Sequence, residues 1–489
     1  MNKGENPMNS EELSSYVFAK LAEAQKLSED NIRTADTPLE HRKTYHRIEK
    51  YVDEFLDGYI ENRFIIMPGL RGIGKTTILF QIYEYLRKEK GITDDRILYI
   101  SVDELSTYLG AKLFEAIDVF VKEVHETSQV NLEKELFILV DEAHYDKEWS
   151  QTGKIIYDKS KKIFLIFTGS SALSFEMNVD AARRIKKEPV FPMNFSEYNI
   201  LKNKIFPPED MASSLRDLIF KGDESSLEYA SKKENEMRRN LIKLERPVEK
   251  EWEDFLFCRD FPFGLNMDRI EVYERVFSMV NRVIEKDVFS LQSFNTDTRN
   301  TISRIITFLA LQDPGGTSDV KLGTILEKSP KLIREILNIL EKTHLIISVK
   351  PYGAAGKVIR KPWKYYFLSP TINAAIRFKL GKYDTRDRKL LGILAESLVV
   401  SYFFRLKETS HMPLGIFYDS GKNGVDFLLQ GLNGIIPVEV GVGKKDKSQI
   451  KKAINKYKSE YGIVISNRTS KITKDGKIIF IPLITFSFI

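Results

Sequence analysis

The chain has 489 residues, enough for about three domains, and 42% of them are hydrophobic, so we expect a sizeable buried core and not a disordered protein. Cys258 is the one cysteine, which excludes an internal disulfide and favours a reducing compartment. No uncharged apolar run reaches membrane-spanning length, and we expect a cytoplasmic protein that does not enter a membrane. The formal net charge is +6, and residues 382–489 carry 18 Lys and Arg against 10 Asp and Glu. This basic region favours a phosphate-rich partner such as DNA, although a lysine-rich solvated face would give the same balance.

The first motif lies between a predicted strand and a predicted helix. Residues 1 to about 60 have the pattern of two polar helices, and the apolar run Phe64 to Met67 then predicts a buried strand. Thr77 to Arg87 predicts a helix. Between them, GLRGIGKT at residues 69–76 fits the phosphate-loop pattern G-x-x-x-x-G-K-[ST] at every fixed position. The alternative, a chance glycine turn, is disfavoured by this strand and helix context.

The residue types of this loop predict a site for ATP and Mg²⁺. Glycines let the backbone turn so that its N–H groups face phosphate oxygens. Lys75 supplies a positive charge for the β- and γ-phosphates, and the Thr76 hydroxyl is a magnesium ligand. Arg71 is a further candidate for contact with the nucleotide or a partner. The predicted nucleotide-binding residues are Gly69, Arg71, Gly72, Ile73, Gly74, Lys75, Thr76 and Thr77.

A second motif follows another buried run. Arg96 to Ser101 predicts a strand, Ala111 to Val124 a helix, and Leu136 to Val140 a strand that ends in Asp141-Glu142. This is the pattern of a Walker B strand. We expect Asp141 to hold Mg²⁺ through Thr76, and Glu142 to polarise the attacking water. The alternative is an acidic strand end that only caps the next helix.

The strand Ile163 to Phe167 ends in Thr168-Gly169-Ser170-Ser171, so a hydroxyl of Thr168 or Ser170 is placed as a sensor of the γ-phosphate. Ordinary turn chemistry is the alternative. Arg183, with its neighbour Arg184, is a candidate arginine finger within one subunit or between subunits. Asp141 to His144 spells DEAH, the motif of superfamily 2 helicases. Such helicases need a second RecA-like domain, which we do not find downstream, so we interpret His144 as an ordinary residue. Val190 to Phe195 predicts a fifth strand.

Alternating strands and helices predict a three-layer α/β fold with a parallel sheet. The pattern after Phe195 is helical. Two charged helices, Asp210 to Gly222 and Ser225 to Leu244, resemble a surface insertion, and Trp252 to Ser290 suits a helical lid.

Residues 299–369 predict three helices followed by a strand hairpin, which is the pattern of a winged helix. Ser329-Pro330 marks the start of the third helix. Basic residues gather on that helix and on the wing: Lys331, Arg334, Lys350, Lys357, Arg360, Lys361 and Lys364. They favour contact with duplex DNA, and a protein-contact module is the alternative.

The C-terminal region predicts a small α/β domain with three acidic residues. Glu396 lies on a predicted helix, and Asp426 and Glu439 lie on two predicted strands. Three such carboxylates match the metal ligands of the PD-(D/E)xK nuclease core. The motif needs a lysine two residues after the last acid, where this chain has Gly441, and Lys444 or Lys445 would have to replace it. We therefore expect a weakened or vestigial nuclease site, and a domain that binds without cutting is the alternative.

Together these motifs resemble the archaeal-type AAA superfamily ATPases that carry a winged helix and a C-terminal restriction-endonuclease-like domain. The likeness covers nearly all of the chain after residue 40. It is carried by Pro68–Thr77, Asp141-Glu142, Thr168–Ser171, Asp260–Phe263, Lys364–Leu368, Val425–Phe427 and Pro437–Gly441. The resemblance implies ATP and Mg²⁺ binding at the positions given above, and it supplies no substrate.

We predict five regions: an N-terminal helical segment (1–60), the ATPase core (61–200), a lid with the charged insertion (201–298), a winged helix (299–380) and an endonuclease-like domain (385–489). The predicted function is ATP hydrolysis coupled to DNA binding. The alternatives are a regulatory switch that acts through protein partners, and an ATP-dependent nuclease, which Gly441 disfavours. A homo-oligomer is plausible because AAA modules often share sites between subunits.

Overall fold

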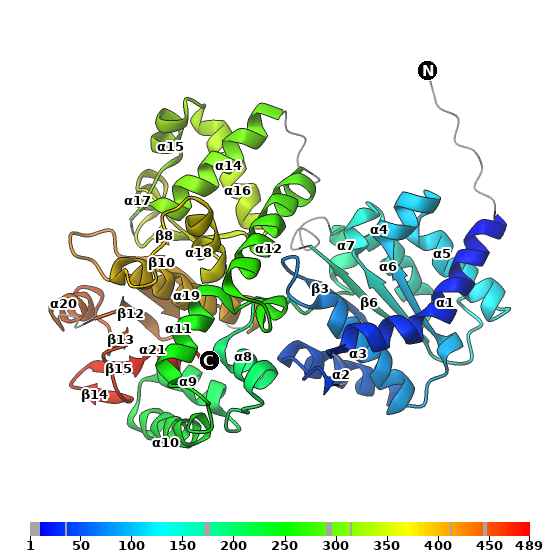
Figure 1. The fold of residues 1–489 in the computed structure, drawn as a ribbon, viewed down its shortest axis with the longest axis horizontal. Helices are drawn as coiled ribbons and strands as arrows, with labels where there is room; N and C mark the ends of the chain where they lie inside the picture. The colour runs from blue at the N-terminus through cyan, green and yellow to red at the C-terminus, as the bar shows by residue number, and fades with distance from the viewer. Residues whose placement is uncertain are drawn as a thin grey trace. The chain divides into compact units, whose positions relative to one another are not determined.

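The structure, a computed structural model, describes residues 10–34, 37–170, 177–289, 296–312, 315–410, 413–443 and 447–489. The chain divides into two compact units, 1–190 and 191–489 (Figure 1). The predicted division into five regions stays a prediction. Ser171, Lys444, Lys445 and the side chain of Lys357 lie outside what the structure describes.

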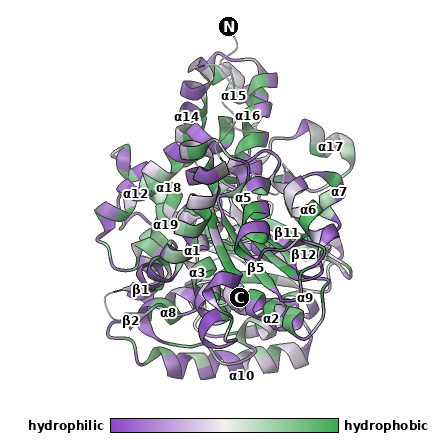
Figure 2. Cartoon of the chain, turned by 90° about the vertical axis from the view of Figure 1, so that its right-hand side faces the viewer, coloured by the Kyte–Doolittle hydropathy of each residue, from purple (hydrophilic) through white to green (hydrophobic). Residues whose placement is uncertain are grey.

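The first unit is built on a sheet of five parallel strands in the order β4-β5-β6-β3-β7. The strands are β3 (Phe64–Pro68), β4 (Ile97–Ser101), β5 (Leu136–Asp141), β6 (Ile163–Gly169) and β7 (Lys186–Lys187). Every residue of β3, β5 and β6 is buried, as expected for parallel strands covered on both faces. Figure 2 shows β5 in the colour of hydrophobic residues. The predicted α/β class is confirmed, and the arrangement fits the P-loop NTPase fold.

Helices cover both faces of this sheet (Figure 1). They are α1 (Ser10–Ile32), α2 (Lys43–Leu56), α3 (Lys75–Lys88), α4 (Val102–Glu104), α5 (Leu113–Val119), α6 (Trp149–Lys159) and α7 (Val179–Ala182). Helix α1 shares a hydrophobic core with α5 and the strands, through Leu13 and Val17. The predicted helix Ala111 to Val124 corresponds to α5 and the π-helical turn Phe120–Val124 that continues it.

The predicted fifth strand, Val190 to Phe195, is wrong. The edge strand is β7, four residues earlier, and the N–H groups of Glu188 and Val190 still donate to the Ile66 and Pro68 carbonyls of β3 at 2.9 Å. Beyond that point Asn194 begins helix α8 (Phe195–Asn203), because Asn194 and Glu197 form a reciprocal capping box. The apolar run that indicated a strand is therefore the entry to a helix.

The second unit is mainly helical in its first half. Its helices are α8, α9 (Met211–Lys221), α10 (Glu224–Leu241), α11 (Val248–Cys258), α12 (Arg269–Arg282), α14 (Thr296–Leu311), α15 (Asp319–Leu326), α16 (Pro330–Lys342), α17 (Ala355–Arg360), α18 (Pro370–Lys379), α19 (Arg388–Thr409), α20 (Lys447–Tyr457) and α21 (Leu483–Phe486). The two charged helices of the predicted insertion are α9 and α10. Ser329 caps α16 by accepting from the N–H of Leu332, as its sequence indicated.

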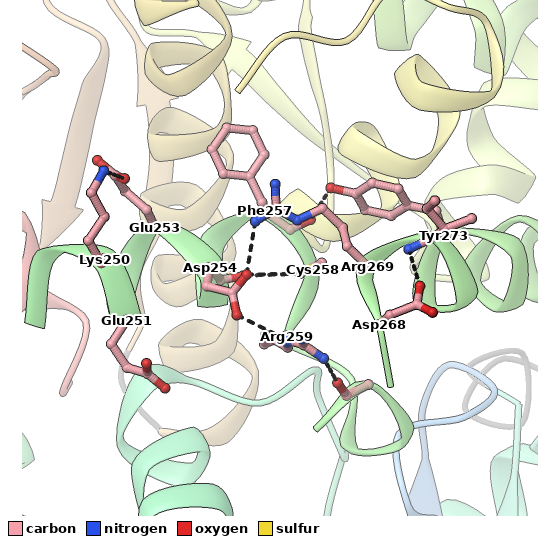
Figure 3. Close-up of polar contacts among 12 residues, drawn as sticks. Lys250, Glu251, Glu253, Asp254, Phe257, Cys258, Arg259, Asp268, Arg269 and Tyr273 are labelled. Atoms are coloured by element: carbon pink, nitrogen blue, oxygen red, sulfur yellow. Dashed lines mark hydrogen bonds and ion pairs between the residues drawn. The ribbon is translucent and has the colours of Figure 1, made fainter. Parts of the chain in front are cut away.

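A cluster of arginines around one carboxylate ties α11 to the start of α12 (Figure 3). Asp254 on α11 accepts from Arg269 at 2.9 Å, from Arg259 at 3.2 Å and from Arg246 at 3.1 Å. These charges hold the pKa of Asp254 well below its usual range against the opposing effect of burial. Arg259 also donates to the carbonyls of Gly264 and Met267, so the turn between the two helices is fixed at both ends.

The second half of this unit contains an eight-stranded mixed sheet in the order β14-β15-β13-β12-β11-β10-β8-β9. Its strands are β8 (Ile346–Pro351), β9 (Lys364–Phe367), β10 (Gly415–Tyr418), β11 (Phe427–Gly431), β12 (Gly434–Gly441), β13 (Gly462–Ser466), β14 (Thr473–Asp475) and β15 (Ile478–Pro482). Strand β8 pairs with β9 on one side and in parallel with β10 on the other. The hairpin predicted for residues 299–380 and the strands predicted for 385–489 thus share one sheet.

One detail of this unit differs from the sequence prediction, because the tip of the predicted hairpin contains the helix α17. The apolar residues from Ile478 onward form strand β15 only to Pro482, and the helix α21 follows. In the part of the chain that the structure describes, no helix is both long enough and apolar enough to span a membrane.

Candidate phosphate-binding site

The loop between β3 and α3 has the backbone shape that its glycines allow. Gly72 and Gly74 have φ values of 76° and 88°, in the left-handed region that favours glycine. A Cβ on Gly69 would lie 2.4 Å from the Val190 carbonyl oxygen, so a side chain there would collide with backbone. The loop leads directly into the N-terminus of the 14-residue helix α3, where a helix favours an anion.

Lys75 is buried and points into the loop. Its ammonium donates to the carbonyl oxygens of Gly69 at 3.1 Å and Leu70 at 2.9 Å. These are neutral acceptors, and a phosphate oxygen would replace them with stronger charge-assisted bonds. The position of Lys75 in the structure is therefore compatible with phosphate binding.

Asp141, at the end of β5, accepts hydrogen bonds from hydroxyl groups of three elements. Thr76 donates to its Oδ2 at 2.7 Å, Tyr99 on β4 donates to the same oxygen at 3.4 Å, and Thr168 on β6 donates to Oδ1. Burial and the nearby charge of Glu142 raise the pKa of Asp141, and the two threonine bonds oppose that shift. The structure brings the predicted pair Thr76 and Asp141 together, and it adds Tyr99, which sequence reasoning missed.

Two hydroxyls of the predicted sensor segment have different surroundings. Thr168 is occupied, since it donates to Asp141 and accepts from the N–H of Glu142 at 3.2 Å. Ser170 is 1% exposed, and its Oγ has no hydrogen-bond partner among the residues that the structure describes. A buried hydroxyl without a partner favours Ser170 over Thr168 as the group that meets a ligand.

Glu142 is surrounded by residues of the phosphate loop and of the turn that follows β5. Its φ is 53°, which turns the chain sharply after the strand. Its Oε1 lies 3.5 Å from Nη1 of Arg71, and its Oε2 lies 3.2 Å from Nδ1 of His144. Burial, with the charges of Arg71 and Lys75, lowers the pKa of His144 to about 3, so the imidazole is neutral. Sequence reasoning set His144 aside, and only its place in the DEAH pattern could have drawn attention to it.

The remaining predicted residues of this site are less central. The carbonyl of the buried Ile73 accepts from Arg42 at 2.6 Å, a contact that sequence reasoning missed. Thr77 lies in the first turn of α3. Arg183 is exposed at the end of α7, and its neighbour Arg184 is held by Asp158. The arginine-finger role of Arg183 stays a prediction.

The side chains at this site fit Mg²⁺ and a nucleoside triphosphate. Asp141 offers one carboxylate and Thr76 one hydroxyl. Mg²⁺ commonly binds to so few protein groups, because waters and phosphate oxygens fill its other coordination positions. The close packing at Gly69, the buried ammonium of Lys75 and the unpartnered hydroxyl of Ser170 are consistent with a phosphate chain in the loop.

The three carboxylates predicted as a nuclease metal site lie on α19, directly before β11 and on β12. Glu396 accepts from the phenol of Tyr366 at 3.2 Å, and Asp426 accepts from the backbone N–H of Val440 at 2.8 Å. Glu439 is buried on β12. Among the residues with described positions, no group of three or more His, Cys, Asp or Glu side chains is placed to hold a metal ion. The predicted role of these three residues as a vestigial or weak nuclease site stays a prediction.

Two family profiles match the chain. One is described as an AAA domain and matches residues 61–199, and the other is described as a domain of unknown function, DUF4143, and matches residues 391–486. Among curated proteins, the chain is similar to the uncharacterised protein MJ1637 of Methanocaldococcus jannaschii. The two are 32% identical over 458 residues, which span 92% of this chain and 91% of that protein.

Several solved structures are also similar to this chain. A Walker-type ATPase of Pyrococcus abyssi is 14% identical, with 71% of this chain and 97% of that chain covered and a TM-score of 0.41. The ORC2 protein of Aeropyrum pernix is 13% identical, with 71% of this chain and 98% of that chain covered and a TM-score of 0.35. DnaA of Aquifex aeolicus bound to AMPPCP is 13% identical, with 64% of this chain and 92% of that chain covered and a TM-score of 0.27. TM-scores this low establish no common arrangement over the whole length.

Proposed function

The chain belongs to the family of the M. jannaschii protein MJ1637 and contains a P-loop ATPase domain of the AAA type, and from this premise we propose that it hydrolyses ATP with Mg²⁺ and couples its nucleotide state to duplex DNA. One observation carries the hydrolytic part. The Thr76 hydroxyl and the Asp141 carboxylate, from two distant segments, meet at 2.7 Å beside the buried Lys75.

Each residue then has a distinct task. Lys75 would neutralise the β- and γ-phosphates, and Thr76 and Asp141 would hold the magnesium ion and its waters. Glu142 orients the attacking water, and Ser170 or Thr168 senses the γ-phosphate. Mg²⁺, when bound, supplies the positive charge that stabilises the transferring phosphoryl group. Arg183, exposed on α7, is available to the site of a second copy of the chain.

The DNA-binding part is supported by the three helices α14, α15 and α16 and the β8–β9 hairpin, joined by a bridge between Thr317 and Trp363. This is the element order of a winged helix, in which the third helix enters the major groove. Lys331 on α16 and the pair Arg360 and Lys361 at the hairpin tip are exposed. They would contact phosphates, which gives affinity without sequence specificity.

A second candidate function is a switch that acts on a protein partner, and specific observations favour it. Arg334 on α16 is paired with Asp319 at 2.8 Å, and Lys350 lies over the Trp363 ring at 4.6 Å. Strand β8 is paired on both sides. Two of the predicted DNA-contacting cations are thus already engaged within the protein. An ATP-dependent nuclease is disfavoured, because β12 ends at Gly441 in the position of the activating lysine.

The test is ATP hydrolysis by the full chain, with and without duplex DNA, beside Lys75→Ala and Glu142→Gln. Hydrolysis that DNA stimulates, and that both substitutions abolish, would support the proposal. Hydrolysis that DNA does not change, together with no salt-dependent DNA binding, would favour the protein-partner switch. No hydrolysis and no nucleotide binding by the wild type would contradict the proposal itself.

A further inference from the structure

The carboxylate of Asp141 accepts four hydrogen bonds from the part of the chain that the structure describes. Thr168 donates to Oδ1, and so does the backbone N–H of Glu142 at 3.2 Å. Thr76 donates to Oδ2 at 2.7 Å, and Tyr99 on β4 donates to the same oxygen at 3.4 Å. A carboxylate has about four lone-pair sites, two on each oxygen. A further donor to Asp141 must therefore displace one of those already there.

A magnesium site at Asp141 needs such a further donor. Mg²⁺ in nucleotide sites keeps several of its waters, and the aspartate at the strand end holds the ion through water. That water can donate to Asp141 only where one of the four donors leaves. The Thr76 oxygen is the proposed direct ligand, and Thr168 and the N–H of Glu142 bond the other carboxylate oxygen. The donor that remains is Tyr99, which shares Oδ2 with Thr76.

The bond from Tyr99 is also easy to give up. Its 3.4 Å exceeds the usual O–H···O distance of about 2.7 Å. The residue is 8% exposed, and its ring packs on Phe80 of α3 with 4.4 Å between centroids, so the ring itself is held in place. Burial and the charges of Asp141 and Glu104 raise the pKa of Tyr99, so the phenol keeps its hydrogen. Glu104 on α4, which Lys20 of α1 holds at 2.9 Å, is thus a second carboxylate that acts on this hydroxyl.

We propose that the Tyr99 hydroxyl keeps the place of the water through which Asp141 holds Mg²⁺. It occupies one acceptor position on Oδ2, and it gives that position up when Mg²⁺ binds with the nucleotide, turning its hydrogen toward Glu104. The bond between Thr76 and Asp141 remains. The two hydroxyls on one oxygen therefore act in opposite directions, since Thr76 favours the ion and Tyr99 competes with it. Tyr99 is a positioning residue, and the inference rests on the proposed ATPase function.

The experiment titrates Mg²⁺ into the full chain with a fluorescent, non-hydrolysable ATP analogue bound, and it requires no turnover. Tyr99→Phe removes only the hydroxyl. We expect the Mg²⁺ concentration for half of the fluorescence change to fall about fivefold, the scale of one net hydrogen bond that no longer has to be broken. Thr76→Ala should raise it. Tyr83→Phe is the matched control, because Tyr83 is also buried and donates to a carboxylate, Asp94, at 3.0 Å. It should behave as the wild type.

An unchanged or higher Mg²⁺ requirement in Tyr99→Phe would overturn the inference, because Tyr99 would then not compete for the position on Asp141. An equal fall in Tyr83→Phe would overturn it as well, since the effect would belong to any lost phenol. In both cases the bound analogue leaves the ATPase proposal standing. If the wild type does not bind the analogue with or without Mg²⁺, the ATPase proposal fails, and the inference about Tyr99 fails with it.

Discussion

The Thr76 hydroxyl donates to Oδ2 of Asp141 at 2.7 Å, so the residue after the phosphate-loop lysine is bonded to the end of the central strand β5. This bond holds two oxygen atoms side by side from segments 65 residues apart. A magnesium ion needs both oxygens near one position, the threonine as a direct ligand and the aspartate through water. The bond between them keeps the pair aligned before the ion arrives.

Thr76→Ala should therefore weaken magnesium use more than nucleotide binding. We expect the Mg²⁺ concentration for half-maximal hydrolysis to rise at least about tenfold, because the loss of even an outer partner of a metal ligand costs that much and Thr76 is proposed as a direct ligand. Binding of a fluorescent ATP analogue without Mg²⁺ should change little. Thr76→Ser keeps the hydroxyl and is the control. An equal loss of activity in both variants, at all Mg²⁺ concentrations, would contradict this role.

Ser170→Ala should slow hydrolysis without loosening nucleotide. The Ser170 hydroxyl is buried and has no hydrogen-bond partner among the described residues, so its removal breaks no hydrogen bond in that part of the chain. We expect kcat to fall by about 10²-fold, as for the loss of one polar contact to the reacting group, with the Kd for the analogue unchanged. Ser213→Ala, on α9, is the control. A variant with wild-type kcat would exclude Ser170 from the sensor role.

Asp254→Asn should destabilise the second unit. Three arginines donate to this carboxylate, and its neutral replacement leaves them facing one another. Figure 3 labels two of them, Arg259 and Arg269. We expect a loss of about 3 kcal/mol in the free energy of unfolding, measured in urea. Glu253→Gln is the matched control on the same helix. Glu253 pairs with the exposed Lys250, so its substitution should change stability by less than about 0.5 kcal/mol. Equal effects of the two substitutions would disprove the special role of Asp254.

Asp260 should make stability depend on pH in the direction opposite to most carboxylates. Burial raises its pKa to about 7, against the hydroxyls of Ser369 and Thr371. A carboxyl group with a raised pKa favours the folded state while it is protonated. That contribution is complete below the unfolded pKa of about 4 and is lost as the pH rises toward 7.

Asp260→Asn removes this titration while keeping the shape of the side chain. Relative to wild type, it should gain stability as the pH rises from about 4 to about 7, by up to about 4 kcal/mol. Urea unfolding of both proteins at the two ends of this range measures the difference. The same difference in stability at both pH values would show that Asp260 is charged in the folded protein.

DNA binding, if present, should depend on the exposed cations and not on those engaged within the protein. Lys331→Ala and Arg360→Ala should each reduce the slope of log affinity against log salt by about 1. Arg334→Ala should change the slope less, because Arg334 is paired with Asp319. The measurement is a salt titration with a labelled duplex. A slope that does not change in Lys331→Ala and Arg360→Ala would move the interface elsewhere.

The ATPase sheet was predictable because each strand is an uninterrupted apolar run, and the residues of its phosphate loop have fixed spacing. The boundaries of β3, β4, β5 and β6 agree with the predicted runs within about two residues, the usual uncertainty of strand ends. The edge strand β7 was not predictable, since Lys186-Lys187 has no apolar pattern and pairs only at the sheet edge. The apolar residues after it drew the prediction to the wrong place.

The parts of the site that the sequence did not reveal depend on contacts between distant segments. His144 and Tyr99 have no spacing relative to the phosphate loop that would identify them, and only the packing of β4 and β5 side by side brings Tyr99 to Asp141. The acidic residues of the C-terminal region show the opposite case. Their sequence pattern suggested a metal site, but the hydrogen bonds of Glu396 and Asp426 could be found only in the structure.

The pairing of β8 with β10 has a mechanical consequence for the second unit. Because β8 is bonded on both sides, a fragment that ends near residue 380 would leave its backbone groups without the partner that β10 provides. Such a fragment would expose the unpaired edge of β8 and would tend to aggregate through it. In the whole protein the pairing of β8 with β10 joins the β8–β9 hairpin, which follows α14, α15 and α16, to the C-terminal strands in one sheet.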